Sequence, residues 1–150
     1  MPGFEYPTSA HRLWGLVAES LQGWQQRMEE VAAAAGISPV AAWALVQLDP
    51  DEPISQKELS NRLHCNPSTV VDPTDRLEEA GLVLRRANPE DRRVNVLVVT
   101  ARGRRARRRL LEELFEPPAA FTRLSERERQ RFLEVMLDVV EGMRSLAAAR

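Results

Sequence analysis

The chain has 150 residues, of which 22 are acidic and 21 basic, so its formal net charge is −1. This balance argues against a uniformly basic nucleic-acid-binding domain, but the charges are unevenly distributed. Residues 85–109 contain ten Arg and only two acidic residues, a local net charge of +8, and the rest of the chain sums to −9. Because the planar guanidinium group fits phosphates and base edges, this segment is a candidate recognition surface.

The bulk composition favours a single globular domain. An apolar content of 43% is enough for a packed core, and no run approaches the roughly 18 to 20 apolar residues that span a bilayer. Residues 1–9 lack the layout of a signal peptide, so we expect a cytoplasmic protein that does not act at a membrane. Cys65, His11 and His64 are the only Cys and His residues. They fall short of four zinc ligands, and we expect no metal and no cofactor.

The first half of the chain predicts helices. The first helix carries apolar residues at helical spacing and ends at Gly36, a typical C-terminal cap. Ser38 followed by Pro39 is an N-cap with a proline in the first turn, and it predicts a second helix as far as about Leu48.

Two further helices form a predicted helix-turn-helix. The capping box of Ser55 and Glu58 starts the first, over residues 56–63. The second covers residues 67–80, and the turn of about three residues between them has the length typical of this motif.

The hydrophobic pattern then changes from helical to strand-like. Residues 82–86 and 94–99 predict two strands joined by a turn at residues 87–90. A helix over residues 101–115 follows, and a capping box at residues 125–128 starts a last helix. We therefore predict an all-α fold with a small two-stranded β-wing.

Two residues in the second helix of the predicted helix-turn-helix do not suit a continuous helix that binds nucleic acid. Asp72 carries a carboxylate, which repels phosphate, although it could accept a hydrogen bond from a cytosine amino group. Pro73 in a helix interior removes a hydrogen bond and clashes with the carbonyl group of residue 69, at a cost of about 3 kcal/mol. We expect a kink or an early break there.

At the hairpin the sequence resembles a known family. Residues 91–93, Asp-Arg-Arg, are followed after five residues by residues 99–103, Val-Thr-Ala-Arg-Gly. This resembles the wing signature of MarR-type winged helix-turn-helix transcriptional regulators, Asp-x-Arg, a strand, then Leu-Thr-x-x-Gly, with Val99 in place of the usual Leu. Residues 68–70 and 75–83 resemble the recognition helix of that family and its exit.

The resemblance implies that the recognition helix enters the major groove and the wing enters the minor groove. The Arg of Asp-x-Arg, here Arg93, would enter the minor groove, and Asp91 would brace the wing by pairing with a nearby Arg. Arg85, Arg86 and Arg92 would contact phosphates or serve the structure. The full predicted set of DNA contacts is Ser68, Thr69, Val71, Asp72, Arg76, Arg85, Arg86, Arg92 and Arg93.

The family pattern also implies the organisation of the chain. We expect one MarR-like domain over residues 1–150, with a winged helix-turn-helix lobe at 54–100 and dimerisation helices within 8–48 and 101–150. A symmetric homodimer would bind double-stranded DNA at a pseudo-palindromic operator, as a repressor that a small effector, for which relatives suggest an aromatic compound, releases. The alternative, motivated by Asp72 and Pro73, is a helical dimer of the same fold that has lost strong DNA binding and binds ligands or proteins.

Two further predictions concern ligands and catalysis. His11, Trp14 and Trp43 are candidates for an aromatic ligand site, and the alternative for the Trp residues is core packing, which Trp on an apolar helix face more often serves. The sequence has no nucleophile elbow, no phosphate-binding Gly loop and no acid–base pair. We therefore expect no catalytic residues and no enzyme activity.

Overall fold

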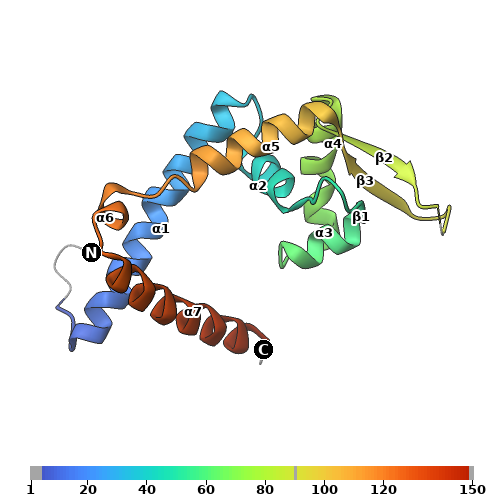
Figure 1. Cartoon of the computed structure of the whole chain (residues 1–150). Coiled ribbons are helices and arrows are strands. Elements are labelled where there is room, and N and C mark those ends of the chain that lie inside the picture. The colour runs from blue at the N-terminus through green and yellow to red at the C-terminus, as the bar shows by residue number, and fades with distance from the viewer. Residues whose placement is uncertain (1–4, 90, 149–150) are drawn as a thin grey trace. The chain divides into compact units, whose positions relative to one another are not determined.

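The computed structural model describes residues 5–89 and 91–148, and the chain divides into two compact units between Phe115 and Glu116. The second unit contains two helices, α6 (Ala119–Thr122) and α7 (Glu126–Ala148). The first unit contains, in chain order (Figure 1), α1 (Ser9–Ala34), α2 (Pro39–Gln47), β1 (Ile54–Ser55), α3 (Gln56–Arg62), the 3₁₀ turn η1 (Pro67–Val70), α4 (Val71–Glu79), β2 (Val83–Ala87), β3 (Asn95–Val99) and α5 (Ala101–Leu114).

Polar side chains cap four helices of the first unit, among them the predicted caps Ser38 and Ser55. The hydroxyl groups of Thr8, Ser38, Ser55 and Thr100 each accept a hydrogen bond from the backbone N–H three residues later. These bonds satisfy amide groups that have no acceptor within the helix. The fold class, mostly helical with a small antiparallel sheet, is confirmed.

The sheet has three antiparallel strands in the order β1-β3-β2, so the two-stranded prediction was incomplete. Strands β2 and β3 pair from Val83 with Val99 to Ala87 with Asn95, and they extend beyond the helices as a hairpin (Figure 1). Ile54 of β1 pairs with Leu97 on the other side of β3. A two-residue strand carries no alternating pattern, which is why the sequence did not predict it. Glu90, the last residue of the predicted turn, lies outside the described residues.

The second helix of the motif is not continuous. A 3₁₀ turn ends at Val70, and α4 begins at Val71. The predicted break therefore exists, but it precedes Pro73, which occupies the third position of α4. A proline there removes an N–H that has no intrahelical acceptor, so the expected interior penalty does not apply.

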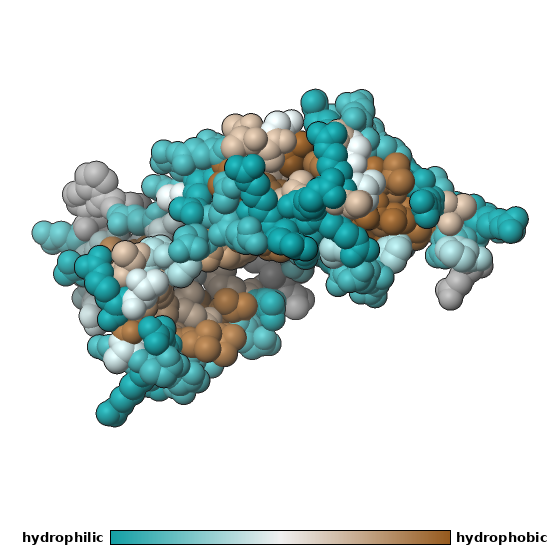
Figure 2. All heavy atoms as spheres, turned by 45° about the horizontal axis from the view of Figure 1, so that its top comes forward, coloured by the Kyte–Doolittle hydropathy of each residue, from teal (hydrophilic) through white to brown (hydrophobic). Residues whose placement is uncertain are grey.

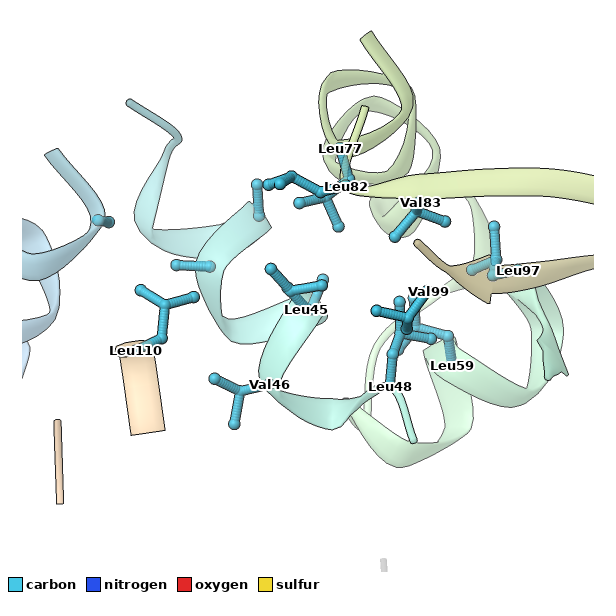
Figure 3. Packing of buried hydrophobic residues seen from close by; sticks show 14 of the residues in the cluster. Leu45, Val46, Leu48, Leu59, Leu77, Leu82, Val83, Leu97, Val99 and Leu110 are labelled. Atoms are coloured by element: carbon cyan, nitrogen blue, oxygen red, sulfur yellow. The ribbon is translucent and has the colours of Figure 1, made fainter. Parts of the chain in front are cut away.

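The core of the first unit lies between the helices and the sheet. Leu45 of α2, Leu59 of α3, Leu77 of α4 and Val83 of β2 are completely buried (Figure 3). Leu110 of α5 closes the same cluster. Burial of such side chains supplies about 1.5–3 kcal/mol each relative to exposure, so this cluster fixes α4 and the hairpin on one scaffold.

Large apolar side chains also remain exposed, and Figure 2 shows apolar patches among the polar surface. Most of them lie on α1, at Leu13, Trp14, Leu16 and Leu21, and on α7, at Phe132, Leu133, Val135, Leu137, Val140, Met143 and Leu146. Among the described residues, no single helix meets the length and hydropathy of a membrane span, and α1 with α2 does so only as a pair bent by 91°.

Candidate nucleic-acid interface

The start of the predicted recognition helix is open to solvent. Ser68, Thr69, Val71 and Asp72 are all exposed, and Val71 retains 44% of its surface. On the inner face of the same segment, Val70 is buried and holds the turn on the core. The structure therefore brings these four predicted contacts together on one exposed turn, with hydroxyl groups available to phosphates or base edges.

Asp72 is paired rather than isolated. Arg76, one helical turn later on α4, donates a hydrogen bond from Nε to Asp72 Oδ2 at 3.0 Å. The hydrogen bond and the negative charge of Asp72 raise the pKa of Arg76 above its ordinary value. Arg76 offsets the negative charge next to the exposed turn, which reduces the conflict that Asp72 poses for phosphate binding.

The wing carries three exposed guanidinium groups. The side chains of Arg86, Arg92 and Arg93 form no hydrogen bond or ion pair within residues 5–89 and 91–148. The Asp91 carboxylate accepts a hydrogen bond from the backbone N–H of Arg93 at 3.0 Å, which closes the turn. Asp91 thus braces the wing through the backbone, and in the described part of the chain it forms no ion pair with an Arg side chain.

Arg85 differs from its neighbours because its guanidinium group faces α4. Its Nη2 donates to Asp75 Oδ1 at 2.5 Å and to Thr74 Oγ1 at 2.9 Å, and its Nη1 pairs with Glu78. The buried Thr74 hydroxyl also accepts a bond from Gln56 Nε2 of α3 at 2.6 Å. We call these five residues, Gln56, Thr74, Asp75, Glu78 and Arg85, the α4–wing network. The sequence left open whether Arg85 contacts phosphate or serves the structure, and this network supports the structural role.

The α4–wing network shifts two pKa values in complementary directions. The backbone N–H of Arg85, and then its guanidinium group, lower the pKa of Glu78 below the ordinary value. Partial burial lowers the pKa of Arg85, but the hydrogen bonds that its guanidinium group donates to Asp75 and Glu78 outweigh this effect, and the pKa is raised overall. Both residues are therefore charged at neutral pH, and they hold β2 against α4.

The Arg residues of α5 are divided between paired and free. Arg104 bonds Asp51 at 2.7 Å, Arg107 bonds the carbonyl oxygen of Val46 at 3.2 Å, and Arg109 bonds Glu113 at 2.7 Å. The free ones in the described chain are Arg102, Arg105 and Arg108. Three of the six Arg residues of α5 therefore bond to other residues of the first unit.

The candidate ligand residues are spread along the first unit. His11 shares a hydrogen bond of 2.7 Å with Thr8, and Trp14 is 47% exposed. Trp43 instead packs edge-on against Trp24, with ring centroids 5.4 Å apart, and both pack against the core. Trp14 lies ten residues from Trp24 on α1, about 15 Å along the helix, so His11 and Trp14 do not join Trp43 within this unit.

The described residues bring together no group of three or more His, Cys, Asp or Glu side chains that could hold a metal ion. Sequence reasoning missed four members of the α4–wing network, Gln56, Thr74, Asp75 and Glu78. The available signal was the spacing of two acidic residues on α4, three positions apart, shortly before an Arg on the following strand.

Comparison with known proteins shows which family the sequence resembles. Residues 37–94 match the family model described as the MarR family. The chain is 31% identical over 99 residues to the HTH-type transcriptional repressor MdtR of Bacillus subtilis (strain 168), a match that covers 63% of this chain and 64% of MdtR. The chain thus spans less than two thirds of the length of that relative.

Solved structures share the fold. A MarR family protein from Bacillus stearothermophilus superposes with a TM-score of 0.78 at 24% identity, covering 91% of this chain and 96% of that one. CouR bound to a 23-mer DNA duplex gives a TM-score of 0.69 at 22% identity, covering 92% and 98%. CouR from Rhodococcus jostii RHA1 bound to p-coumaroyl-CoA gives 0.71 at 22% identity, covering 91% and 94%.

Proposed function

We propose that the chain, whose residues 37–94 match the MarR family model, is a MarR-family transcriptional regulator that binds a pseudo-palindromic double-stranded DNA operator as a homodimer and represses transcription. Residues 54–100 form the DNA-binding lobe of this proposal. The helices within 8–48 and 101–150 supply the dimerisation surfaces. A dimer would bury the exposed apolar side chains of α1 and α7.

One observation carries the proposal. The hairpin presents the unpaired guanidinium groups of Arg86, Arg92 and Arg93, and in the same unit the turn η1, directly before α4, presents the exposed Ser68 and Thr69. The unpaired guanidinium groups of the wing fit contacts to phosphates and to the minor groove. The exposed hydroxyl groups before α4 fit contacts in the major groove. The α4–wing network fixes the two elements relative to each other.

The proposed effector is a small ligand, and the solved complex of CouR with p-coumaroyl-CoA supports an aromatic acyl compound as its class. Such a ligand releases the operator only when it binds the DNA-free spacing of the two recognition helices more tightly than the DNA-bound spacing.

Selection of bound fragments from a random double-stranded DNA pool, followed by anisotropy titrations over a salt series, tests the proposal. We expect two half-sites about one helical turn apart and a log–log salt slope near −0.9 for each neutralised phosphate. Arg93→Ala should weaken binding and reduce the slope by about one. Arg127→Ala, an exposed residue of α7, is the matched control.

A weak, salt-independent response with no enriched sequence would overturn the proposal. It would favour the alternative, a helical dimer that binds ligands or proteins. The observation that favours this alternative is the exposed carboxylate of Asp72 in the first turn of α4, which repels phosphate.

A further inference from the structure

Asp72 and Arg76 form an ion pair on the face of α4 that points away from the core. Arg76 Nε donates to Asp72 Oδ2 at 3.0 Å, and both side chains are exposed. Thr74, which lies about 200° around the helix from each of them, is completely buried. An exposed ion pair of this kind adds little to stability, so its position next to the open turn of Ser68 and Thr69 is the feature to explain.

The pair leaves two donors and one acceptor unused. Its bond occupies Nε of Arg76 and Oδ2 of Asp72. Within the part of the chain that the structure describes, the two Nη groups of Arg76 and Oδ1 of Asp72 form no other hydrogen bond or ion pair. Because the guanidinium group is a rigid planar fork, the bond at Nε also restricts where both Nη groups point. The pair therefore presents a fixed fork of donors with an acceptor beside it.

One base pair presents the complementary pattern in the major groove. In a G·C pair, guanine N7 and O6 accept hydrogen bonds, and the cytosine N4 amino group donates one. We infer that Asp72 and Arg76 act as one unit that reads a single G·C pair in each half-site of the operator. Arg76 donates from its Nη groups to guanine N7 and O6, while Asp72 orients Arg76 and accepts from cytosine N4. This inference rests on the proposed function and assigns the base pair that its recognition helix selects.

The carboxylate makes the unit selective. An A·T pair has an amino group where guanine has O6, and a carbonyl oxygen where cytosine has N4. On that pair an Nη group of Arg76 would meet another donor, and Asp72 would meet another acceptor. Groups left unpaired in an interface lose their water without a replacement, which costs affinity. The charge of Asp72 therefore lowers the affinity for unrelated DNA more than the affinity for the operator.

Selection from a random double-stranded DNA pool with the parent chain, Asp72→Ala and Arg76→Ala tests the inference. Both variants should lose the preference for G·C at the same position of the half-site and keep every other preference. Arg109→Ala is the matched control, because Arg109 Nε also donates to a carboxylate one helical turn away, Glu113, at 2.7 Å on α5. It should keep all preferences. Circular dichroism confirms that each variant is folded.

Anisotropy titrations with the selected operator separate base reading from a structural role. 7-Deazaguanine at the assigned position removes the N7 acceptor, so we expect about tenfold weaker binding by the parent chain and by Arg109→Ala. Arg76→Ala should be insensitive to this replacement. Asp72→Ala should bind random DNA more tightly and the operator more weakly. Loss of a merely structural pair would not move these two affinities in opposite directions.

The outcomes distinguish failure of the inference from failure of the proposed function. Unchanged base preferences in both Asp72→Ala and Arg76→Ala would overturn the inference and leave the proposed function intact. The same holds if the parent chain tolerates 7-deazaguanine at every guanine of the half-site, a result that needs no variant to fold. A parent chain that enriches no sequence would refute the proposed function and the inference together.

Discussion

The guanidinium group of Arg85 on β2 lies 2.5 Å from the carboxylate of Asp75 on α4. This contact joins the wing to the recognition helix across the tight turn at Gly81, where φ is +68°. Because the side chain of Arg85 is only 23% exposed, the pair is screened less by solvent than the surface pairs of α7. Arg85 therefore sets where the free guanidinium groups of the wing are held relative to α4.

Replacement of this anchor should reduce both stability and DNA binding. Arg85→Gln leaves Asp75 and Glu78 without their cation, so we expect a loss of about 1–3 kcal/mol in the free energy of unfolding, measured by urea denaturation. Arg86→Gln, at the adjacent exposed position, should leave stability unchanged and weaken DNA binding only. Equal stability losses in the two variants would contradict a special role for Arg85.

The start of α5 depends on a close backbone approach at Gly103. A Cβ atom there would lie 2.0 Å from the carbonyl oxygen of Leu82, which also accepts a hydrogen bond from the backbone N–H of Thr100 at 3.0 Å. Gly103→Ala must therefore shift α5 or the exit of α4, and we expect destabilisation of about 1–3 kcal/mol.

Thermal and urea unfolding of the Gly103→Ala variant measure this loss, with Gly23→Ala as the control. Gly23 is in α1 and a Cβ there meets no described atom within 4 Å, so alanine should stabilise that helix slightly, by up to about 1 kcal/mol. Unchanged stability of Gly103→Ala would show that the fold does not depend on the close approach of Gly103 to the carbonyl oxygen of Leu82.

Local signals in the sequence account for most of the fold. The caps at Ser38, Ser55 and Thr100 act within four residues of the chain, and three of the five residues of β3 are the β-branched residue Val. Such features were predictable because their energies depend on neighbours in sequence. Strand β1 was not, since two residues become a strand only when β3 is beside them.

The candidate site was predictable only in part for the same reason. The exposure of Ser68 and Thr69 follows from their place at a helix start. By contrast, the sequence alone did not separate the structural Arg85 from the free Arg86, because the choice depends on which strand face meets α4. In a strand, adjacent side chains point to opposite faces, and the position of α4 decides which face is covered.

The apolar face of α7 provides a test of the homodimer. Met143 is 50% exposed and lies near the middle of the apolar face, where a charge would be buried unpaired in an interface. Met143→Glu should convert the dimer to monomer in analytical ultracentrifugation and weaken operator binding. Ser145→Glu adds the same charge about 200° around the helix and should leave the dimer intact. A dimer unaffected by Met143→Glu would remove α7 from the interface.

The lowered pKa of Glu78 predicts how stability depends on pH. A carboxyl group with a lower pKa in the folded state contributes stability that is fully present above its unfolded pKa, about 4.3. This contribution is lost as the pH falls through the lower folded value. In urea denaturation from pH 7 to pH 3, the parent chain should be more stable than Glu78→Gln at neutral pH, and the difference should shrink below about pH 4. Glu79→Gln, at an exposed neighbouring position of α4, should show no such convergence. A stability difference between the parent chain and Glu78→Gln that stays constant down to pH 3 would mean that the charge of Glu78 does not hold the wing to α4.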